Sequence, residues 1–171
     1  YPEKVEKLVF PDIAPKDYLE NKEDSQFYLH QNILLAMQEV DFSEIKKRDD
    51  VNDVLAEKID NPRIRKFLLK NVDKDKETRK YKWRLNPEAL YDYLEEIVGG
   101  VNRRWFEDRI PINSYPVIFI RGLESDYILD KDIELIKEIY PDARVEDIPK
   151  AGHWLHAEQP KKFIKAVLLC C

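Results

Sequence analysis

The most constraining feature of the sequence is the segment over residues 116–121, which is apolar without interruption as far as Arg121 and which Gly122 closes. A run without polar alternation is typical of a parallel strand covered on both faces, because such a strand has no side that faces solvent. The segments that follow are a helical pattern, a second strand and a final helix, over residues 131–140, 143–148 and 161–169. Strand, helix, strand and helix in this order predict a right-handed parallel α/β unit.

A histidine, His153, lies in the short loop between the strand over residues 143–148 and the final helix. Gly152 is predicted to allow a backbone turn there that a side chain would forbid. Open α/β sheets place their ligand sites at the carboxyl ends of the strands. Because imidazole takes up and releases protons near neutral pH, a histidine at this place can act as a general base. His156, three residues later, is interpreted as a rim or core histidine.

The N-terminal part of the chain has a different organisation. Residues 5–10 are predicted to form a short strand that Pro11 closes, and helical spacing dominates the residues up to 98. We expect four helices in this part, over residues 27–40, 50–59, 62–69 and 88–98. Between the third and the fourth helix we expect a charged turn over residues 73–80 and a short strand over residues 81–85. The predicted domains are a core strand with its acid loop, a helical lid and a C-terminal α/β core, over residues 1–16, 17–98 and 99–171.

Composition limits the partners and sites that can be expected. The net charge is −5 over 171 residues, so neither nucleic acid nor an anionic membrane is an expected partner. No apolar run is long enough for a membrane span, and no signal peptide is expected. The adjacent Cys170 and Cys171 exclude a disulfide framework and favour a reducing interior. No residue spacing fits a metal site or a phosphate loop, so we expect neither a metal nor a cofactor.

Four tracts carry a resemblance to a known family. In chain order they are Val9-Phe10-Pro11-Asp12-Ile13-Ala14-Pro15, Tyr81-Lys82-Trp83-Arg84-Leu85-Asn86, Arg121-Gly122-Leu123-Glu124-Ser125-Asp126-Tyr127 and Ala151-Gly152-His153-Trp154-Leu155-His156-Ala157. The chain resembles the C-terminal half of an α/β-hydrolase, within a subfamily of bacterial short-chain esterases, the mitochondrial abhydrolase-domain-11 type and yeast ethanol acetyltransferases. The resemblance implies a partial α/β-hydrolase fold with about three parallel core strands, flanking helices and a helical lid insertion.

One motif of this family is absent. The nucleophile motif G-x-S-x-G brackets a serine between glycines, and none of the four glycines stands in such a position. The family places this serine just upstream of the strand with which the chain begins. The resemblance therefore implies a fragment whose partner is the missing N-terminal half of the same protein, and we expect the chain alone to be inactive.

Ester cleavage by a serine triad needs a nucleophile, a base and an acid that orients the base. His153 is the predicted base. Asp12, at the end of the first strand, is the favoured acid, both by the geometry of strand ends and by the resemblance. Asp126 is the alternative, because most α/β-hydrolases carry their acid near this place. Ser125 occupies that usual place and is predicted to support His153 or Asp12 through a hydrogen bond.

Three functions fit these features. The first is a serine carboxylic-ester hydrolase for short or medium acyl esters, the second an alcohol acyltransferase of the same fold, and the third a non-catalytic interaction fragment. The first two imply a small-molecule ester or acyl-thioester substrate, with Trp154, Trp83 and Ser125 as candidate contacts. Core packing explains either tryptophan equally well. The resemblance also implies an intracellular, mitochondrial location.

Overall fold

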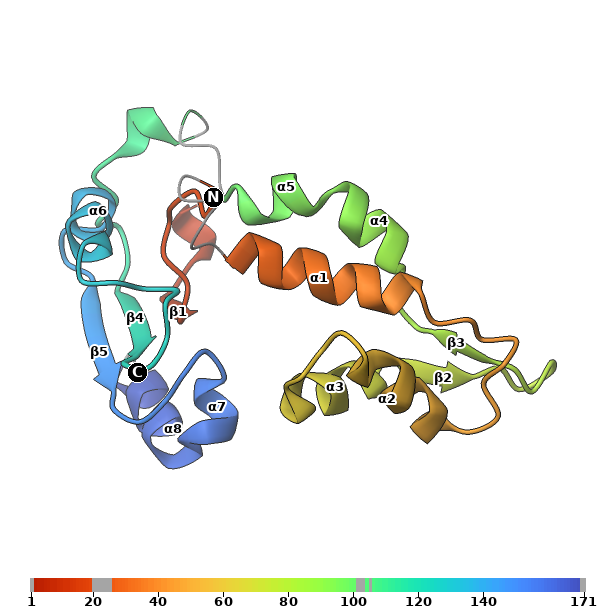
Figure 1. Ribbon diagram of the computed structural model, residues 1–171. Coiled ribbons are helices and arrows are strands. Elements are labelled where there is room, and N and C mark those ends of the chain that lie inside the picture. Colours follow the sequence, from red (N-terminus) through yellow and green to blue (C-terminus); the bar gives the residue numbers. More distant parts are fainter. Residues whose placement is uncertain (1, 20–25, 101–103, 105, 170–171) are drawn as a thin grey trace. The chain divides into compact units, whose positions relative to one another are not determined.

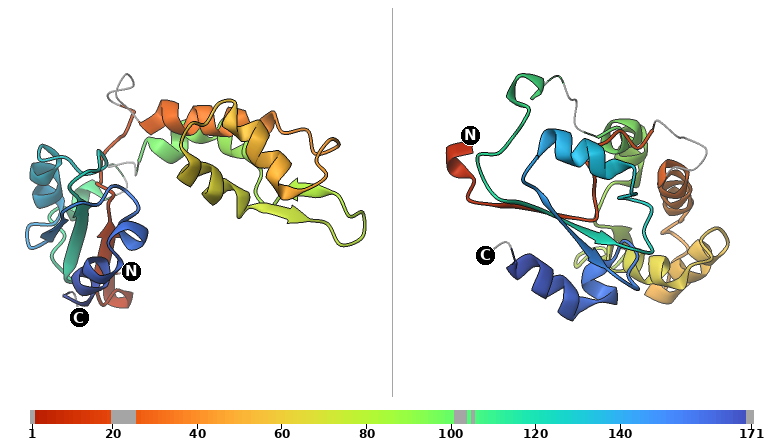
Figure 2. Two further views of the ribbon diagram at one scale, coloured as in Figure 1. Left: turned by 60° about the horizontal axis from the view of Figure 1, so that its bottom comes forward. Right: turned by 90° about the vertical axis from the view of Figure 1, so that its left-hand side faces the viewer.

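The computed structural model describes residues 2–19, 26–100, 104 and 106–169, which form two compact units (Figures 1 and 2). Unit 1 combines residues 1–16 with residues 101–171, and unit 2 consists of residues 17–100. Two segments that are far apart in the sequence therefore build unit 1. No helix among the described residues is long and apolar enough to cross a membrane.

A three-stranded parallel sheet forms the centre of unit 1 (Figure 1). Its strands lie in the order β1, β4 and β5 and cover Leu8–Pro11, Val117–Gly122 and Arg144–Ile148. The α/β class and the three parallel strands are therefore confirmed. The first strand begins at Leu8, three residues later than predicted, and it includes Pro11; a short 3-10 helix, Pro2–Lys4, precedes it.

Both faces of β4 are covered, as its apolar run predicted. On one face Val117 and Phe119 pack with the helix α6, Asp132–Ile139, and on the other face Ile118 and Ile120 pack with the final helices. These four side chains are at most 5% exposed, and burial of each such side chain contributes about 1.5 to 3 kcal/mol to stability. The final helices are the short α7 and the longer α8, Leu155–Glu158 and Pro160–Leu168 (Figure 2).

The C-terminal elements of unit 1 differ in detail from the prediction. The predicted final helix begins at Pro160, because proline is favoured in the first turn of a helix, where its missing N–H has no partner to lose. The short α7 before it was not predicted. A 3-10 helix, Glu107–Arg109, lies before β4 and was not predicted either.

Unit 2 contains helices and a small antiparallel sheet. Among the described residues, its helices are α1 (Gln26–Gln38), α2 (Arg48–Ala56), α3 (Pro62–Leu69), α4 (Pro87–Asp92) and α5 (Leu94–Val98). Its strands are β2 (Val72–Lys74) and β3 (Tyr81–Trp83), which lie between α3 and α4 in the sequence. The prediction of the strand at Tyr81 is confirmed, and it pairs with β2. The helix predicted over residues 88–98 is wrong, because the backbone at Tyr93 leaves the helical conformation and separates α4 from α5.

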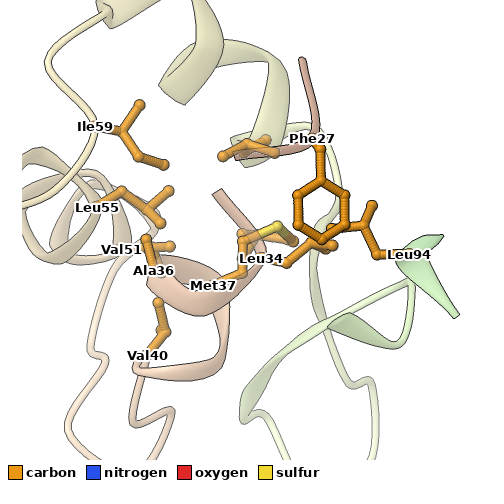
Figure 3. Close-up of a cluster of buried hydrophobic side chains, with 11 residues drawn as sticks. Phe27, Leu34, Ala36, Met37, Val40, Val51, Leu55, Ile59 and Leu94 are labelled. Carbon is orange, nitrogen blue, oxygen red and sulfur yellow. The ribbon is translucent and has the colours of Figure 1, made fainter. Parts of the chain in front are cut away.

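Unit 2 has its own hydrophobic core (Figure 3). Phe27, Leu34 and Met37 of α1 belong to one buried cluster with Val51 and Leu55 of α2. These residues recur at the spacing of one helical face, and burial of that face is what stabilises short helices in water. The helical spacing in the sequence therefore identified the buried sides of both helices.

Candidate active site

Asp12 lies directly after β1, at the carboxyl end of the strand, with a backbone φ of 52°. Few residues other than glycine adopt this left-handed conformation, although aspartate is one of those enriched in it. Its N–H donates to Ile120 O at 2.7 Å, so the turn stays attached to β4. The Asp12 carboxylate is fully buried at the end of that strand.

Three groups among the described residues donate hydrogen bonds to the Asp12 carboxylate. Gly122 N–H donates to Oδ1 at 2.9 Å, and His153 Nδ1–H donates to Oδ2 at 3.0 Å. The Ser125 hydroxyl also donates to Oδ2. These donors compensate the cost of burying a carboxylate. Because a carboxylate oxygen can only accept, the bond fixes the imidazole proton on Nδ1 and leaves Nε2 of His153 as the acceptor nitrogen.

The imidazole of His153 is also held on one face. The ring of Tyr127 stacks on it, with ring centroids 3.8 Å apart and an interplanar angle of 17°. The His153 side chain is 41% exposed. Burial and the negative charge of Asp12 raise the pKa of Tyr127, so the phenol is neutral at neutral pH.

The segment of residues 149–154, here called the His loop, is tied to the loop that follows β4. Leu123 N–H donates to Ile148 O at 3.1 Å, and Glu124 N–H donates to Ala151 O at 2.9 Å. From the other side, Gly152 N–H donates to the Glu158 carboxylate at 2.6 Å. The first bond joins the end of β5 to the loop after β4, and the other two connect the His loop to that loop and to α7.

The predicted role of Gly152 is wrong. Its φ is not in the left-handed region, and the atoms nearest to an added Cβ would lie 3.5 Å away, which is an ordinary contact. The left-handed residue of the His loop is Lys150, with a φ of 60°. Gly122 is the position that needs glycine, because a Cβ there would lie 2.5 Å from Gly152 O and 2.6 Å from Ala151 O.

The two candidate acids have different surroundings. Asp12 receives the His153 hydrogen bond, whereas Asp126 is exposed and no such bond reaches it from any part of the chain that the structure describes. Ser125 donates its hydroxyl to Asp12 and accepts a hydrogen bond from Tyr127 N–H at 3.3 Å. The structure therefore gives Ser125 a contact with Asp12 and not with His153.

The two tryptophans named from the sequence lie in different units. Trp154 belongs to the His loop, directly before α7, and is half-buried. Trp83 lies in unit 2, where its Nε1–H donates to Met37 O at 2.9 Å and its ring contacts Phe42 edge to face. Trp83 therefore packs in the core of unit 2, and substrate contact by either tryptophan stays a prediction.

An ion pair between neighbouring strands joins the carboxyl ends of β4 and β5. Arg121 of β4 donates to both carboxylate oxygens of Asp147 of β5, at 2.8 and 2.9 Å, and also to Asp130 at 2.6 Å. The hydrogen bonds to Asp147 raise the pKa of Arg121, so the guanidinium is always charged. Bidentate pairs of this kind are among the stronger ion pairs because both hydrogen bonds share one geometry.

This arrangement can accept a proton at one defined nitrogen of His153. Sequence reasoning missed Tyr127 and Glu158, which hold the ring and the loop. Tyr127 ends the tract that begins at Arg121, and Glu158 is the last residue of α7. Only their three-dimensional contacts show that they support the site. Across residues 2–19, 26–100, 104 and 106–169, no group of three or more histidine, cysteine or acidic residues is arranged to hold a metal ion.

Removal of the Glu158 carboxylate should loosen the His loop. Glu158→Ala leaves Gly152 N–H without its charged acceptor, so we expect the free energy of unfolding to fall by about 1 to 3 kcal/mol. Chemical denaturation measures this change. Glu134→Ala, at an exposed residue of α6, is the matched control, with an expected change within about 0.5 kcal/mol. Equal losses in the two variants would contradict a specific role for Glu158.

Known proteins resemble this chain in sequence and in fold. Esterase YbfF of Escherichia coli is 31% identical over 96% of this chain, and the zebrafish (Danio rerio) sn-1-specific diacylglycerol lipase ABHD11 is 31% identical over 98% of it. The solved structure of a marine microorganism esterase is 40% identical, with a TM-score of 0.88 over 99% of this chain. No family model matches the sequence.

The match covers only part of each of these proteins. The chain spans 57% of YbfF, 50% of the zebrafish lipase and 62% of the marine esterase. The resemblance that the four tracts carry is nevertheless confirmed, because it is found independently in the sequences and in the three-dimensional arrangement of the strands and helices. In sequence and in fold, this chain is similar to esterases of the α/β-hydrolase fold.

Proposed function

We propose that this chain supplies the base and the acid of a serine carboxylic-ester hydrolase. The observation that carries the proposal is the hydrogen bond of 3.0 Å between His153 Nδ1 and the buried carboxylate of Asp12. A general base in a serine hydrolase needs a fixed tautomer, a fixed orientation and one accessible nitrogen. Asp12 fixes the tautomer, Asp12 and the Tyr127 stack together hold the orientation, and the exposure of the His153 side chain supports the third.

In the proposed reaction, Nε2 of His153 accepts the proton of a serine hydroxyl while the serine oxygen attacks the carbonyl carbon of the ester. The imidazolium then gives this proton to the alkoxide that leaves as an alcohol, and the acyl group stays on the serine. Water attacks the acyl-serine with the same help from His153, which releases a carboxylic acid and regenerates the serine. Asp12 holds Nδ1–H and stabilises the imidazolium in both steps.

The proposed nucleophile is none of the four serines in these 171 residues. Ser125 donates its hydroxyl to Asp12, so this hydroxyl is not available to Nε2 of His153. Ser43 belongs to unit 2 and hydrogen-bonds Asp41, and Ser25 lies outside the described residues. We propose that a serine of the N-terminal half, which the resemblance implies, completes the triad.

Small-molecule esters with short or medium acyl chains, or acyl thioesters, are the proposed substrates. The names of the relatives support an ester class, since one is an esterase and another is a diacylglycerol lipase. Unit 2 is proposed as the lid of the enzyme.

An alcohol in place of water at the second step would make the protein an acyltransferase, which is the second candidate. A mitochondrial location is proposed from the family resemblance alone, and imaging of the tagged protein tests it.

The proposed chemistry predicts where a serine-directed probe reacts. The protein produced from the complete gene should hydrolyse p-nitrophenyl acetate or butyrate, and a fluorophosphonate should label one serine outside these 171 residues. The 171-residue chain alone should show neither activity nor labelling, because the proposed nucleophile lies outside it. Peptide mass spectrometry locates the label, and product analysis with ethanol present separates acid from ester products.

Two outcomes would contradict this proposal. Stoichiometric labelling of Ser25, Ser43, Ser114 or Ser125 would place the nucleophile inside the chain. Hydrolysis that survives His153→Ala without loss would remove the base from the mechanism. The control variant is His156→Ala, at an exposed histidine of α7, which should retain its activity.

A further inference from the structure

We propose that Tyr127 is a positioning residue of the ester hydrolase, whose ring fixes the plane of the His153 imidazole. This inference rests on the proposed function of His153 as the base. The geometry that carries it is the stack between the two rings, with centroids 3.8 Å apart and planes 17° from parallel.

The Asp12 hydrogen bond alone does not determine the orientation of the imidazole. A single bond from Nδ1 to Asp12 Oδ2 fixes one atom of the ring and leaves its plane to tilt within the range that the side-chain torsions of His153 allow. Contact with an aromatic face at van der Waals distance restricts this tilt, since a larger tilt would drive the ring edge into Tyr127. The two contacts act in perpendicular directions and together determine where Nε2 of His153 points.

Tyr127 is itself held firmly enough to serve as this support. Its N–H donates to the Ser125 hydroxyl at 3.3 Å, and this hydroxyl donates to Asp12. The next residue, Ile128, is 1% exposed and belongs to the core between the sheet and α6. The short segment that carries Tyr127 is therefore attached at one side to the acid and at the other side to the hydrophobic core.

The stack also favours the charged form of the base. When His153 accepts the serine proton it becomes a cation, and the π face of a neutral aromatic ring attracts a cation. Burial and the Asp12 charge raise the pKa of the phenol, so Tyr127 presents a neutral ring at neutral pH. The attraction comes from the ring and not from the hydroxyl, so phenylalanine should replace tyrosine with little loss.

Steady-state kinetics on the protein from the complete gene test this role. Tyr127→Leu should lower kcat about tenfold with KM nearly unchanged, because a cation–π contact and its orientation act on the charged base. Tyr127→Phe should stay within about threefold of the wild type. Similar losses in both variants would assign the effect to the hydroxyl and overturn the inference, as would full activity of Tyr127→Leu.

An NMR measurement tests the stack without any activity. Ring current from Tyr127 should shift the His153 ring protons upfield in the wild type and in Tyr127→Phe, and this shift should disappear in Tyr127→Leu. Thermal unfolding shows whether each variant is folded. A His153 resonance that does not move in a folded Tyr127→Leu overturns the inference, even if no ester is hydrolysed. Loss of hydrolysis in the wild type, by contrast, would overturn only the proposed function.

Discussion

Asp12→Asn should lower the turnover of the complete enzyme by a factor on the order of 10⁴, as loss of the orienting aspartate does in serine triads. The amide oxygen can accept from Gly122 N–H, but its NH2 group would then face the Ser125 hydroxyl and His153 Nδ1. The imidazole must change its tautomer or its orientation to satisfy this donor. Either change removes the accessible acceptor nitrogen that the reaction needs.

Asp126→Asn is the matched control, because it makes the same chemical change at an exposed aspartate. We expect its kcat to stay within about threefold of the wild type, as is usual for an exposed residue outside special features. Asp12→Asn should also cost about 1 to 3 kcal/mol of stability, since it leaves a buried donor without an acceptor. Enzyme kinetics and thermal unfolding of both variants measure these effects, and the reverse ranking of the two turnovers would move the acid to Asp126.

The sequence was sufficient to bring Asp12 and His153 to the same edge of the sheet. Both follow predicted strands, and the carboxyl ends of parallel strands meet at one edge whatever the details of the loops. The apolar run of β4 predicted that helices cover both faces, and they do. These features depend on strand direction and hydrophobic pattern, which local sequence specifies well.

Features that depend on contacts between distant segments could not be predicted. The stack of Tyr127 on His153 joins two loops, and nothing in the sequence around Tyr127 distinguishes it from a core tyrosine. The break at Tyr93 between α4 and α5 interrupts a spacing that is helical throughout. The hydrogen bond of Trp83 to the backbone carbonyl of Met37 joins two distant segments in the core of unit 2, and substrate contact by Trp83 stays a prediction. In each case tertiary packing decided between local alternatives.

The sequence predicted that Gly152 must be a glycine, whereas the structure requires a glycine at Gly122. The reason is the distance between the strands that carry the acid and the base. β4 lies between β1 and β5, so the strands that carry Asp12 and His153 are two strand spacings apart, or about 10 Å. Their side chains meet across the end of β4, and the His loop must therefore pass close to that end. Gly122 is the residue at this crossing, and the sequence showed only that it ended a strand.

Gly122→Ala is therefore expected to damage the site without touching a catalytic group. Its Cβ would lie 2.5 Å from Gly152 O and 2.6 Å from Ala151 O, and both are backbone atoms that cannot rotate away. The His loop must move, and displacement of a catalytic base by about 1 Å can cost on the order of 10² in turnover. We also expect a loss of about 1 to 3 kcal/mol in stability from overpacking.

Gly152→Ala is the matched control for Gly122→Ala. Both changes add one methyl group where the His loop passes the end of β4. The nearest atoms to the new methyl group would be 3.5 Å away, and the backbone there is not left-handed. Turnover should stay within about threefold of the wild type, and stability should change by less than about 1 kcal/mol. Kinetics and thermal unfolding of the two variants decide the matter. A larger loss in Gly152→Ala than in Gly122→Ala would mean that the turn before His153, and not the crossing over β4, holds the base in position.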